Sequence, residues 1–217
     1  MNTAIVLHAS LPAVPRALWW ESPLLQSLPY ARRLQLEGNS GEQRQASLAG
    51  LALALLGAER VTGHPFAPRN FSFPLDRKPT LAGGPAFSLS HSAHHVACCV
   101  AADIECGLDL EDVPVGVDAA GRDRLQRWTA TEALLKAAGR GVRDLREARL
   151  ESALEAGTVA DERFKLQPLK GLPGVIGHVA SRGELGLTTV AVDLDGRELS
   201  AALERSLGLA AEFDQAP

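Results

Sequence analysis

Residues 87–111 read FSLSHSAHHVACCVAADIECGLDLE and contain the most informative pattern in the chain. The last five residues, GLDLE, place two acids two positions apart. Because successive side chains of a strand point to opposite faces, Asp109 and Glu111 share one face and Leu108 and Leu110 the other. Two carboxylates with Cβ atoms about 7 Å apart suit a hard cation. A solvated strand edge would show the same pattern, so the pair needs support from the rest of the chain.

The composition of the 217 residues is that of an ordinary globular protein, with 46% hydrophobic and 22% charged residues. The net charge of −4 gives no broad field toward nucleic acid or an anionic membrane. Aromatic residues make up 5% of the chain, which argues against a stacking platform for single-stranded nucleic acid. We therefore expect neither a nucleic-acid nor a membrane partner.

The cysteines and the N-terminal residues bear on the cellular compartment. Cys98, Cys99 and Cys106 are odd in number, and two of them are adjacent in an apolar run, which favours reduced thiols in the core. The first ten residues, MNTAIVLHAS, lack the basic start and long apolar stretch of a signal peptide. The apolar run at 47–58 is too short to span a bilayer. We expect a cytoplasmic protein.

Local patterns predict alternating helices and strands. Proline spacing between Pro12 and Pro29 allows only short helices there. Helices are expected from Ser40 to residue 58 and over 123–139, and a short helix is expected over 197–213. Strands, including two short extended pieces between residues 71 and 85, are expected at the following positions: 3–8, 96–102, 106–112, 163–170, 175–182 and 187–195.

The order of these elements predicts an α+β fold with two comparable halves, 1–95 and 96–217. We interpret 96–102 and 106–112 as the two strands of a hairpin.

Two further segments carry candidate chemistry. In WTATEALLKAAGRG, Trp128, Glu132 and Lys136 are spaced four apart and share one helical stripe. Such a Glu–Lys pair is most often a solvated ion pair worth roughly 0.3–0.5 kcal/mol. In FSLSHS, Ser90 and His91 lie at the end of a short extended segment.

Two other sites are compatible with single features of the sequence. His91, His94 and His95 would suit zinc only with a further ligand at recognised spacing. Asp109 and Glu111 could form a glycosidase pair, but acids two apart on one strand rarely flank a sugar bond from both sides. Both are weaker interpretations than a joint reading of the three motifs.

In their order, F-S-L-S-H-S, G-L-D-L-E and W-T-A-T-E-A-L-L-K, the motifs resemble those of the 4′-phosphopantetheinyl transferases of the surfactin-synthetase-activating type. The resemblance covers about residues 30–142. It implies a pseudo-twofold monomer of two α+β halves, each a helix packed on a small antiparallel sheet. It also implies transfer of the phosphopantetheine arm of coenzyme A to a serine of an acyl or peptidyl carrier protein, with release of 3′,5′-ADP.

The resemblance assigns a role to each candidate catalytic residue. Asp109, Glu111 and Glu132 would hold Mg²⁺, or Mn²⁺, which the same oxygen ligands serve. Glu132 is also a candidate base for the carrier serine. Lys136 would meet phosphate oxygens as a point charge.

The resemblance also assigns residues to coenzyme A binding. Ser90 and His91 correspond to contacts with the nucleotide end of coenzyme A, with the histidine at the 3′-phosphate. Arg44 would meet the same phosphate, and Lys78 matches a Lys-Pro element beside the adenine. An exposed helix charge remains an equal interpretation of Arg44.

The chain departs from the family pattern in four places. Thr131 replaces a lysine before the helix glutamate, Arg32 and Arg33 lack the usual preceding basic residues, and 93–95 is Ala-His-His. The segment 112–127 is shorter than in most relatives, and its glycines and aspartates predict a flexible loop where others form part of a carrier-docking surface.

Two alternatives remain open. One is a degenerate relative that binds coenzyme A or a carrier without efficient transfer, favoured by Thr131 and the short loop. The other is a metal-dependent hydrolase of a nucleotide-like pyrophosphate, which the Ser90–His91 segment fits less well.

Overall fold

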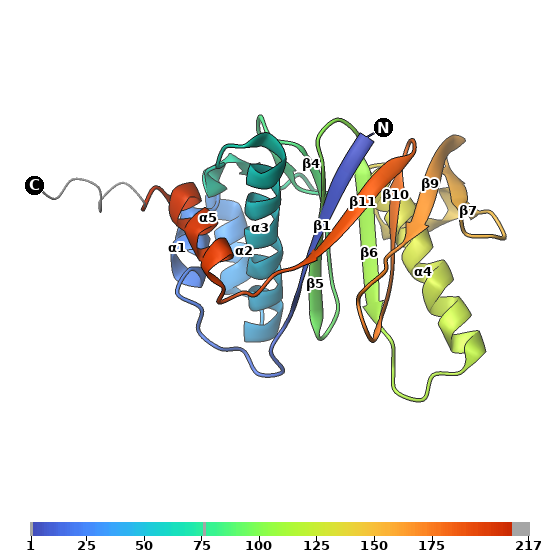
Figure 1. Cartoon of the computed structure of the whole chain (residues 1–217), viewed down its shortest axis with the longest axis horizontal. Helices are drawn as coiled ribbons and strands as arrows, with labels where there is room; N and C mark the ends of the chain where they lie inside the picture. The colour runs from blue at the N-terminus through green and yellow to red at the C-terminus, as the bar shows by residue number, and fades with distance from the viewer. Residues whose placement is uncertain (1, 76, 210–217) are drawn as a thin grey trace, which may run out of the picture.

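The computed structural model describes residues 2–75 and 77–209 and shows a mixed α+β fold (Figure 1). The helices are α1 (Glu21–Ser27), α2 (Tyr30–Glu37), α3 (Gly41–Thr62), α4 (Ala119–Ala137) and α5 (Arg197–Leu207), with 3-10 turns η1 (Pro68–Asn70) and η2 (Val142–Glu147). The strands are β1 (Asn2–Ser10), β2 (Phe71–Ser72), β3 (Thr80–Leu81), β4 (Ala86–His91), β5 (His95–Ala101), β6 (Cys106–Asp112), β7 (Ala148–Leu150), β8 (Ala156–Val159), β9 (Glu162–Pro168), β10 (Val175–Ser181) and β11 (Leu185–Ala191).

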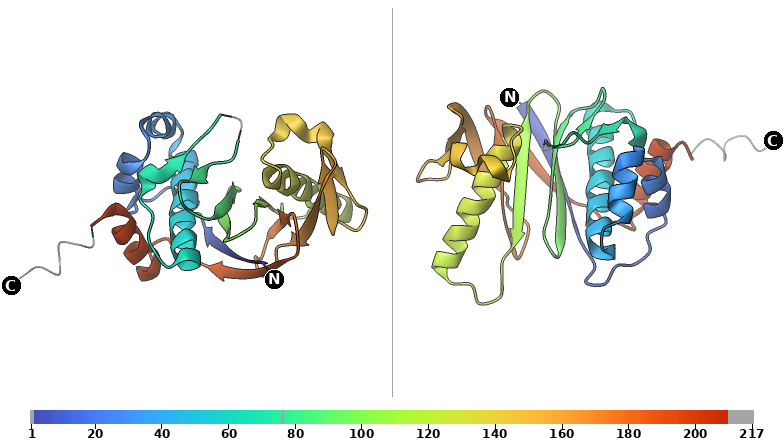
Figure 2. Two further views of the ribbon diagram at one scale, coloured as in Figure 1. Left: turned by 90° about the horizontal axis from the view of Figure 1, so that it is seen from above. Right: turned by 180° about the vertical axis from the view of Figure 1, so that it is seen from behind.

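Two main sheets stand between helices in a layered arrangement (Figures 1 and 2). The first sheet has the strand order β11-β1-β5-β4, and the second has the order β6-β10-β9-β8-β7. Helix α3 packs directly on the first sheet, α1, α2 and α5 pack against α3, and α4 covers the second sheet. β2 and β3 form a separate two-stranded ribbon.

Helix α3 is the core of the first layer because its sequence is apolar on nearly every side. Residues from Gln45 to Ala58 are almost all buried, which is typical of a helix enclosed by other elements. Ser40 caps its N-terminus by accepting a hydrogen bond from the Gln43 amide, and Gly63 ends it in the left-handed conformation. The helix predicted from Ser40 is confirmed and continues to Thr62.

A second apolar cluster joins the two sheets face to face. Strand alternation directs Val6 and Cys99 into it from the first sheet and Leu108 and Leu110 from the second. The adjacent cysteines therefore point to opposite sides, because Cys98 lies in the core around α3. All three cysteines are buried free thiols, as the sequence predicts.

The predicted hairpin of 96–102 with 106–112 is wrong. β5 pairs with β1 and β4, whereas β6 pairs with β10, so these consecutive strands belong to different sheets. Strand patterns give the orientation of side chains but not the partner strand.

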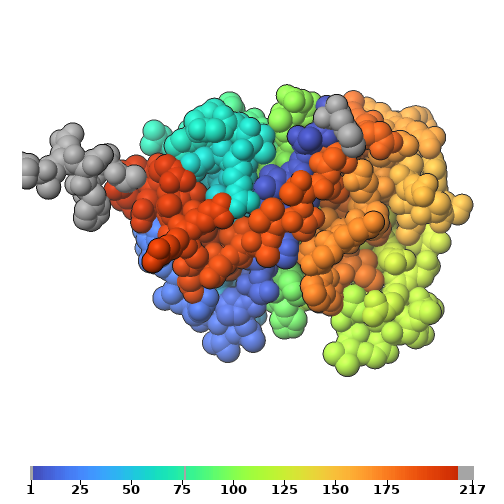
Figure 3. Space-filling model, in the orientation of Figure 1, coloured from blue at the N-terminus to red at the C-terminus, as the bar shows by residue number. Residues whose placement is uncertain are grey.

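The ends of the chain meet in the first sheet. β11 pairs in parallel with β1, with Asn2 opposite Leu185, and α5 packs on α3. In the space-filling view the orange-red segment that contains β11 lies against the blue N-terminal strand (Figure 3). The first sheet thus combines strands from both sides of the division expected after residue 95.

The segment 112–127 differs from the flexible loop predicted for it. Only 113–118 connects β6 to α4, and α4 begins at Ala119. The Asp118 carboxylate accepts a hydrogen bond of 2.7 Å from the Gly121 amide and caps the helix. The aspartate that we interpreted as a loop residue is therefore a helix-start signal.

The remaining predictions have mixed outcomes. The strands at 3–8, 163–170 and 175–182 are confirmed, and the strand expected at 187–195 is confirmed only to Ala191. One short helix, α1, lies between Pro12 and Pro29, whereas β7 and β8 were not predicted. The C-terminal helix is confirmed to Leu207, and residues 210–213 of its expected range lie outside the described residues. Within the described residues, no helix is long and apolar enough to cross a membrane.

Candidate functional site

A candidate binding site is a cleft of about 510 Å³ between the β3–β4 region and the α4–η2 region. Its floor is apolar, with Leu89 and Leu135 among the lining residues. Cations enter its lining from both sides: Arg77, Lys78, Lys136, Arg140 and Arg143. Such a cleft favours an elongated ligand with an apolar portion and more than one negative charge.

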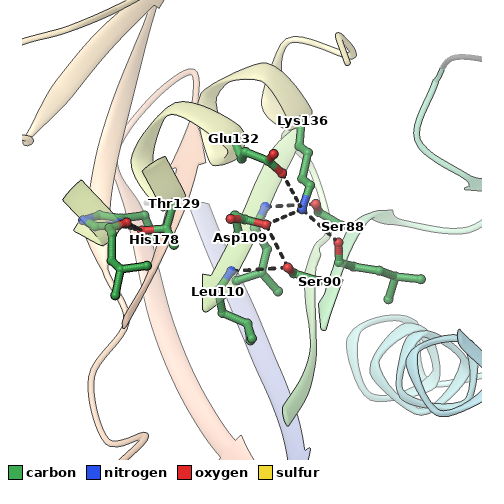
Figure 4. Close-up of polar contacts among 11 residues, drawn as sticks. Ser88, Ser90, Asp109, Leu110, Thr129, Glu132, Lys136 and His178 are labelled. Carbon is green, nitrogen blue, oxygen red and sulfur yellow. Dashed lines mark hydrogen bonds and ion pairs between the residues drawn. The ribbon is translucent and has the colours of Figure 1, made fainter. Parts of the chain in front are cut away.

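Asp109 lies at the centre of the polar contacts beside this cleft (Figure 4). Its side chain is buried, with 4% of the residue exposed. Its Oδ1 atom accepts hydrogen bonds from the Ser90 hydroxyl at 2.8 Å and from the Lys136 ammonium at 2.6 Å. Its Oδ2 atom is buried and has no hydrogen-bond partner among the described residues. A buried carboxylate oxygen without a partner is costly and is a ready acceptor for a cation or a donor.

Two serines of β4 connect the edges of the two sheets. The Ser88 hydroxyl accepts from the Leu108 amide at 2.9 Å, and the Ser90 hydroxyl accepts from the Leu110 amide at 3.3 Å. Ser88 and Ser90 alternate on one face of β4, as F-S-L-S-H-S requires. β6 is the edge strand of the second sheet, and these hydroxyls accept from amides on its outer edge. Because Ser90 also donates to Asp109, it both joins the sheets and orients this carboxylate.

Helix α4 contributes Glu132 and Lys136 to the same cluster. The Lys136 Nζ atom lies 3.8 Å from Glu132 Oε2 and 3.5 Å from the Leu89 carbonyl oxygen. The four-residue spacing therefore places both side chains toward Asp109, as predicted from the sequence (Figure 4). Thr131 instead donates to the Arg127 carbonyl oxygen within the helix.

Gly107 allows α4 to approach β6 closely. A Cβ atom at this position would lie 2.0 Å from the Ala133 carbonyl oxygen and 2.3 Å from the Ala137 amide nitrogen. Because these are backbone atoms of α4, only glycine permits this spacing. The glycine of GLDLE thus places Glu132 and Lys136 next to Asp109.

Glu111 lies two positions beyond Asp109 on the same face of β6. Burial raises its pKa, and the charges of Asp109 and Asp112 raise it further, while a hydrogen bond with Trp128 opposes the shift. Burial also raises the pKa of Glu132, again with a contribution from Asp109. The charge of Asp109 therefore disfavours the charged forms of Glu111 and Glu132, and a cation among these side chains would relieve this repulsion.

The cluster fits a hard divalent cation in the chemistry of its donors. Asp109, Glu111 and Glu132 offer carboxylate oxygens, and Asp109 Oδ2 is both buried and unpartnered. As the side chains stand, the described part of the chain contains no group of three His, Cys, Asp or Glu residues arranged to hold a metal. Lys136 instead supplies the positive charge at Asp109.

His91 ends β4 near the charged cluster. Burial lowers its pKa, the Lys136 ammonium lowers it further, and Asp109 opposes the shift. His91 also lines a second hollow of about 380 Å³ with the first turn of α3.

The remaining sequence candidates lie at different distances from the cluster. Lys78 lines the cleft, donates to the Cys106 carbonyl oxygen at 2.9 Å and pairs with Glu105. Arg44 lies on the first turn of α3, half-buried, and is not among the described residues that line the cleft. The structure therefore brings together Asp109, Glu132, Lys136 and Ser90, while Arg44 stands apart.

The sequence reasoning missed His178, a buried residue of β10 directly opposite Asp109 in the sheet. Its Nδ1 atom lies 2.8 Å from the Thr129 hydroxyl (Figure 4). Because Thr129 already donates to the Leu125 carbonyl oxygen at 3.0 Å, the histidine Nδ1–H is the donor. A histidine inside the apolar strand VIGHVAS was the available signal.

The buried histidine predicts a loss of stability in acid. Burial lowers the pKa of His178 to about 4. The unfolded chain, with a histidine pKa of about 6.5, therefore binds the proton first, and stability falls as pH drops from about 6.5 to 4. The expected loss by pH 4 is about 3 kcal/mol from this residue. Denaturant unfolding between neutral pH and pH 4 measures it.

A variant isolates the contribution of His178 from those of other groups. His178→Asn keeps a donor near the Nδ1 position but removes the titration. Its unfolding free energy is expected to depend less on pH in this window than that of the wild type. Equal slopes for the two proteins would show that His178 does not carry the effect.

The chain was also compared with known proteins. No protein-family model matches it, and no curated protein does. Functional inference therefore depends on the geometry of the site and on the motifs that occupy it.

Proposed function

We propose that the protein transfers the phosphopantetheine arm of coenzyme A to a serine of an acyl or peptidyl carrier protein, using Mg²⁺ or Mn²⁺. The observation that carries the proposal is the Asp109 carboxylate. Its Oδ1 atom is fixed by Ser90 and Lys136. Its Oδ2 atom is buried and has no hydrogen-bond partner among the described residues. Beside this carboxylate lies the cleft, which Glu132 and cationic side chains line. These residues are the ones that the three motifs contribute.

The cleft and its cations support coenzyme A as the substrate. Coenzyme A combines several phosphate charges with a long, largely uncharged arm, and the cleft combines five cationic side chains with an apolar floor. Lys78 and Lys136 lie in this lining, while His91 lies near Lys136 at the end of β4. In this proposal Arg44 and His91 meet the 3′-phosphate.

The carboxylates and Lys136 supply the groups that phosphoryl transfer needs. A divalent cation held by Asp109, Glu111 and Glu132 would neutralise charge on the pyrophosphate. The carrier serine oxygen forms a bond to the phosphorus of the arm, and the bond from that phosphorus to the ADP oxygen breaks. Glu132 accepts the serine proton, a role favoured by its raised pKa. Lys136 stabilises the phosphate oxygens.

The architecture supports the same assignment. Each main sheet carries one long helix on its outer face, α3 on the first and α4 on the second. In this proposal the two layers are the pseudo-twofold halves of the transferase fold, and the protein acts as a monomer in the cytoplasm.

A coenzyme A-binding protein without transfer is the second candidate. The observation that favours it is the 2.6 Å ion pair between Lys136 and Asp109 Oδ1. In this pair the Lys136 ammonium neutralises a carboxylate that was predicted to bind the metal. Thr131, which donates within α4 rather than into the cleft, adds no cation for the phosphates.

A single assay separates these functions. The protein is incubated with coenzyme A, Mg²⁺ and several apo carrier proteins, and intact carrier masses are recorded. Transfer adds one phosphopantetheine group to a carrier, and chelation of the metal abolishes the addition. Binding of coenzyme A without any change of carrier mass supports the binding protein. Breakdown of coenzyme A without a carrier supports a hydrolase and contradicts both.

A further inference from the structure

A short turn between β4 and β5 is held by a carboxylate from the other sheet. The turn comprises residues 92–94 and leads into His95, the first residue of β5, and the carboxylate belongs to Asp112 at the end of β6. Asp112 Oδ2 accepts from the His94 amide at 2.9 Å, and Asp112 Oδ1 lies 2.7 Å from His95 Nδ1. The side chains of His95 and Asp112 are only 20% and 22% exposed.

The turn is also fixed to its own sheet. The Ser92 amide donates to the His95 carbonyl oxygen at 2.8 Å, and the Leu11 amide donates to the His94 carbonyl oxygen at 2.8 Å. The first sheet therefore holds the turn through backbone bonds, and the second sheet holds it through Asp112. Asp112 therefore connects the two sheets at the end of β6, beyond the Leu108 and Leu110 amides that Ser88 and Ser90 bind.

Asp112 is charged when it makes these contacts. Burial alone would raise its pKa, but the hydrogen bonds from His95 and the His94 amide oppose burial, and the net effect lowers the pKa. Bonds to an ionised acceptor are about twice as strong as bonds between neutral groups.

The two ends of this connection are adjacent to the site. His91 immediately precedes the turn, and Glu111 immediately precedes Asp112. The Ser90 bonds hold the backbone to β6 on one side of His91, and the contact between Asp112 and the turn holds it on the other side. Neither Asp112 nor His95 is part of the motifs on which the functional proposal depends.

We propose that Asp112 is a positioning residue that holds His91 at the distance from Asp109 and Glu111 at which one coenzyme A molecule engages both. The inference depends on the proposed function, because it assumes that His91 meets the 3′-phosphate. Loss of Asp112 then weakens the contact with that phosphate, while the acids and Lys136 keep their own contacts. The apolar cluster between the sheets and the Ser88 and Ser90 bonds still join them.

The test compares coenzyme A with dephospho-coenzyme A, which lacks the 3′-phosphate. Affinities of both are measured by calorimetry for the wild type, Asp112→Ala, Asp112→Asn and a control, Asp195→Ala. Asp195 pairs with Arg16 at the surface, away from the cluster. Asp112→Ala is expected to bind coenzyme A about tenfold more weakly, consistent with the loss of charge-assisted bonds. Its affinity for dephospho-coenzyme A is expected to stay at the wild-type value.

The variants distinguish positioning from a purely structural role. Asp112→Asn keeps an acceptor for the His94 amide and is expected to recover part of the affinity. Unchanged affinity of Asp112→Ala for coenzyme A would overturn the inference, as would an equal loss for both ligands. A wild type that binds coenzyme A but does not distinguish it from dephospho-coenzyme A overturns the inference while leaving transfer possible. A wild type that binds neither overturns the proposed function itself.

Discussion

Asp109→Asn is expected to lower the rate of phosphopantetheine transfer roughly a hundredfold or more, because one substitution removes a central charge from the cation site. Asparagine has nearly the same shape, and its carbonyl oxygen can still accept from Ser90. It no longer carries the charge that attracts Lys136 or a divalent cation. Carrier mass recorded over time measures the rate.

A second measurement separates loss of the metal from loss of the fold. A ligand that binds only the folded state raises the unfolding temperature. Mg²⁺ is therefore expected to raise the unfolding temperature of the wild type and to leave the unfolding temperature of Asp109→Asn unchanged. Asp103→Asn makes the same chemical change in the exposed turn before β6 and is expected to match the wild type in both assays. Wild-type transfer by Asp109→Asn would remove the basis of the proposed function.

Gly107→Ala is expected to produce the largest loss of stability, more than about 3 kcal/mol. The added methyl group would overlap the Ala133 carbonyl oxygen and the Ala137 amide nitrogen, at 2.0 Å and 2.3 Å. Neither atom can move without displacing α4 from the second sheet. The midpoint of denaturant unfolding measures the loss.

The same substitution is expected to affect transfer in the molecules that remain folded. Displacement of α4 moves Glu132 and Lys136 away from Asp109, so activity falls even where the protein is fully folded. Gly183→Ala is the matched control, because the nearest atom to its new Cβ, Ile104 Cδ1, is at an ordinary 3.7 Å. An unfolding midpoint for Gly107→Ala equal to that of Gly183→Ala would show that α4 tolerates the added atom.

Sequence patterns predicted the parts of the site that depend on local geometry. The alternation in GLDLE places Asp109 toward α4 and Leu108 toward the other sheet, as expected. The spacing of Glu132 and Lys136 places both beside Asp109. Both predictions hold because the period of a strand or helix fixes the direction of a side chain.

Features that depend on distant pairing were not accessible in this way. The alternation of apolar residues in β5 and β6 is compatible both with a hairpin and with strands in separate sheets. The packing of Val6 and Cys99 against Leu108 distinguishes the two arrangements, because it places the strands in facing sheets. His178 reaches the site because β10 pairs with β6, a contact that no local pattern encodes. Asp112 likewise meets His95 only after the two sheets have come together.

The parallel pair of β1 with β11 has a consequence for synthesis of the protein. Asn2 and Leu185 are neighbours in this pair, so the first sheet lacks its outer strand until synthesis has passed residue 191. Until then β1 presents an edge of unpaired backbone groups, which is a template for pairing with another chain. Pairing between such distant segments is also slow, because the long intervening loop must close first. The nascent protein therefore passes through an aggregation-prone period that ends only when β11 arrives.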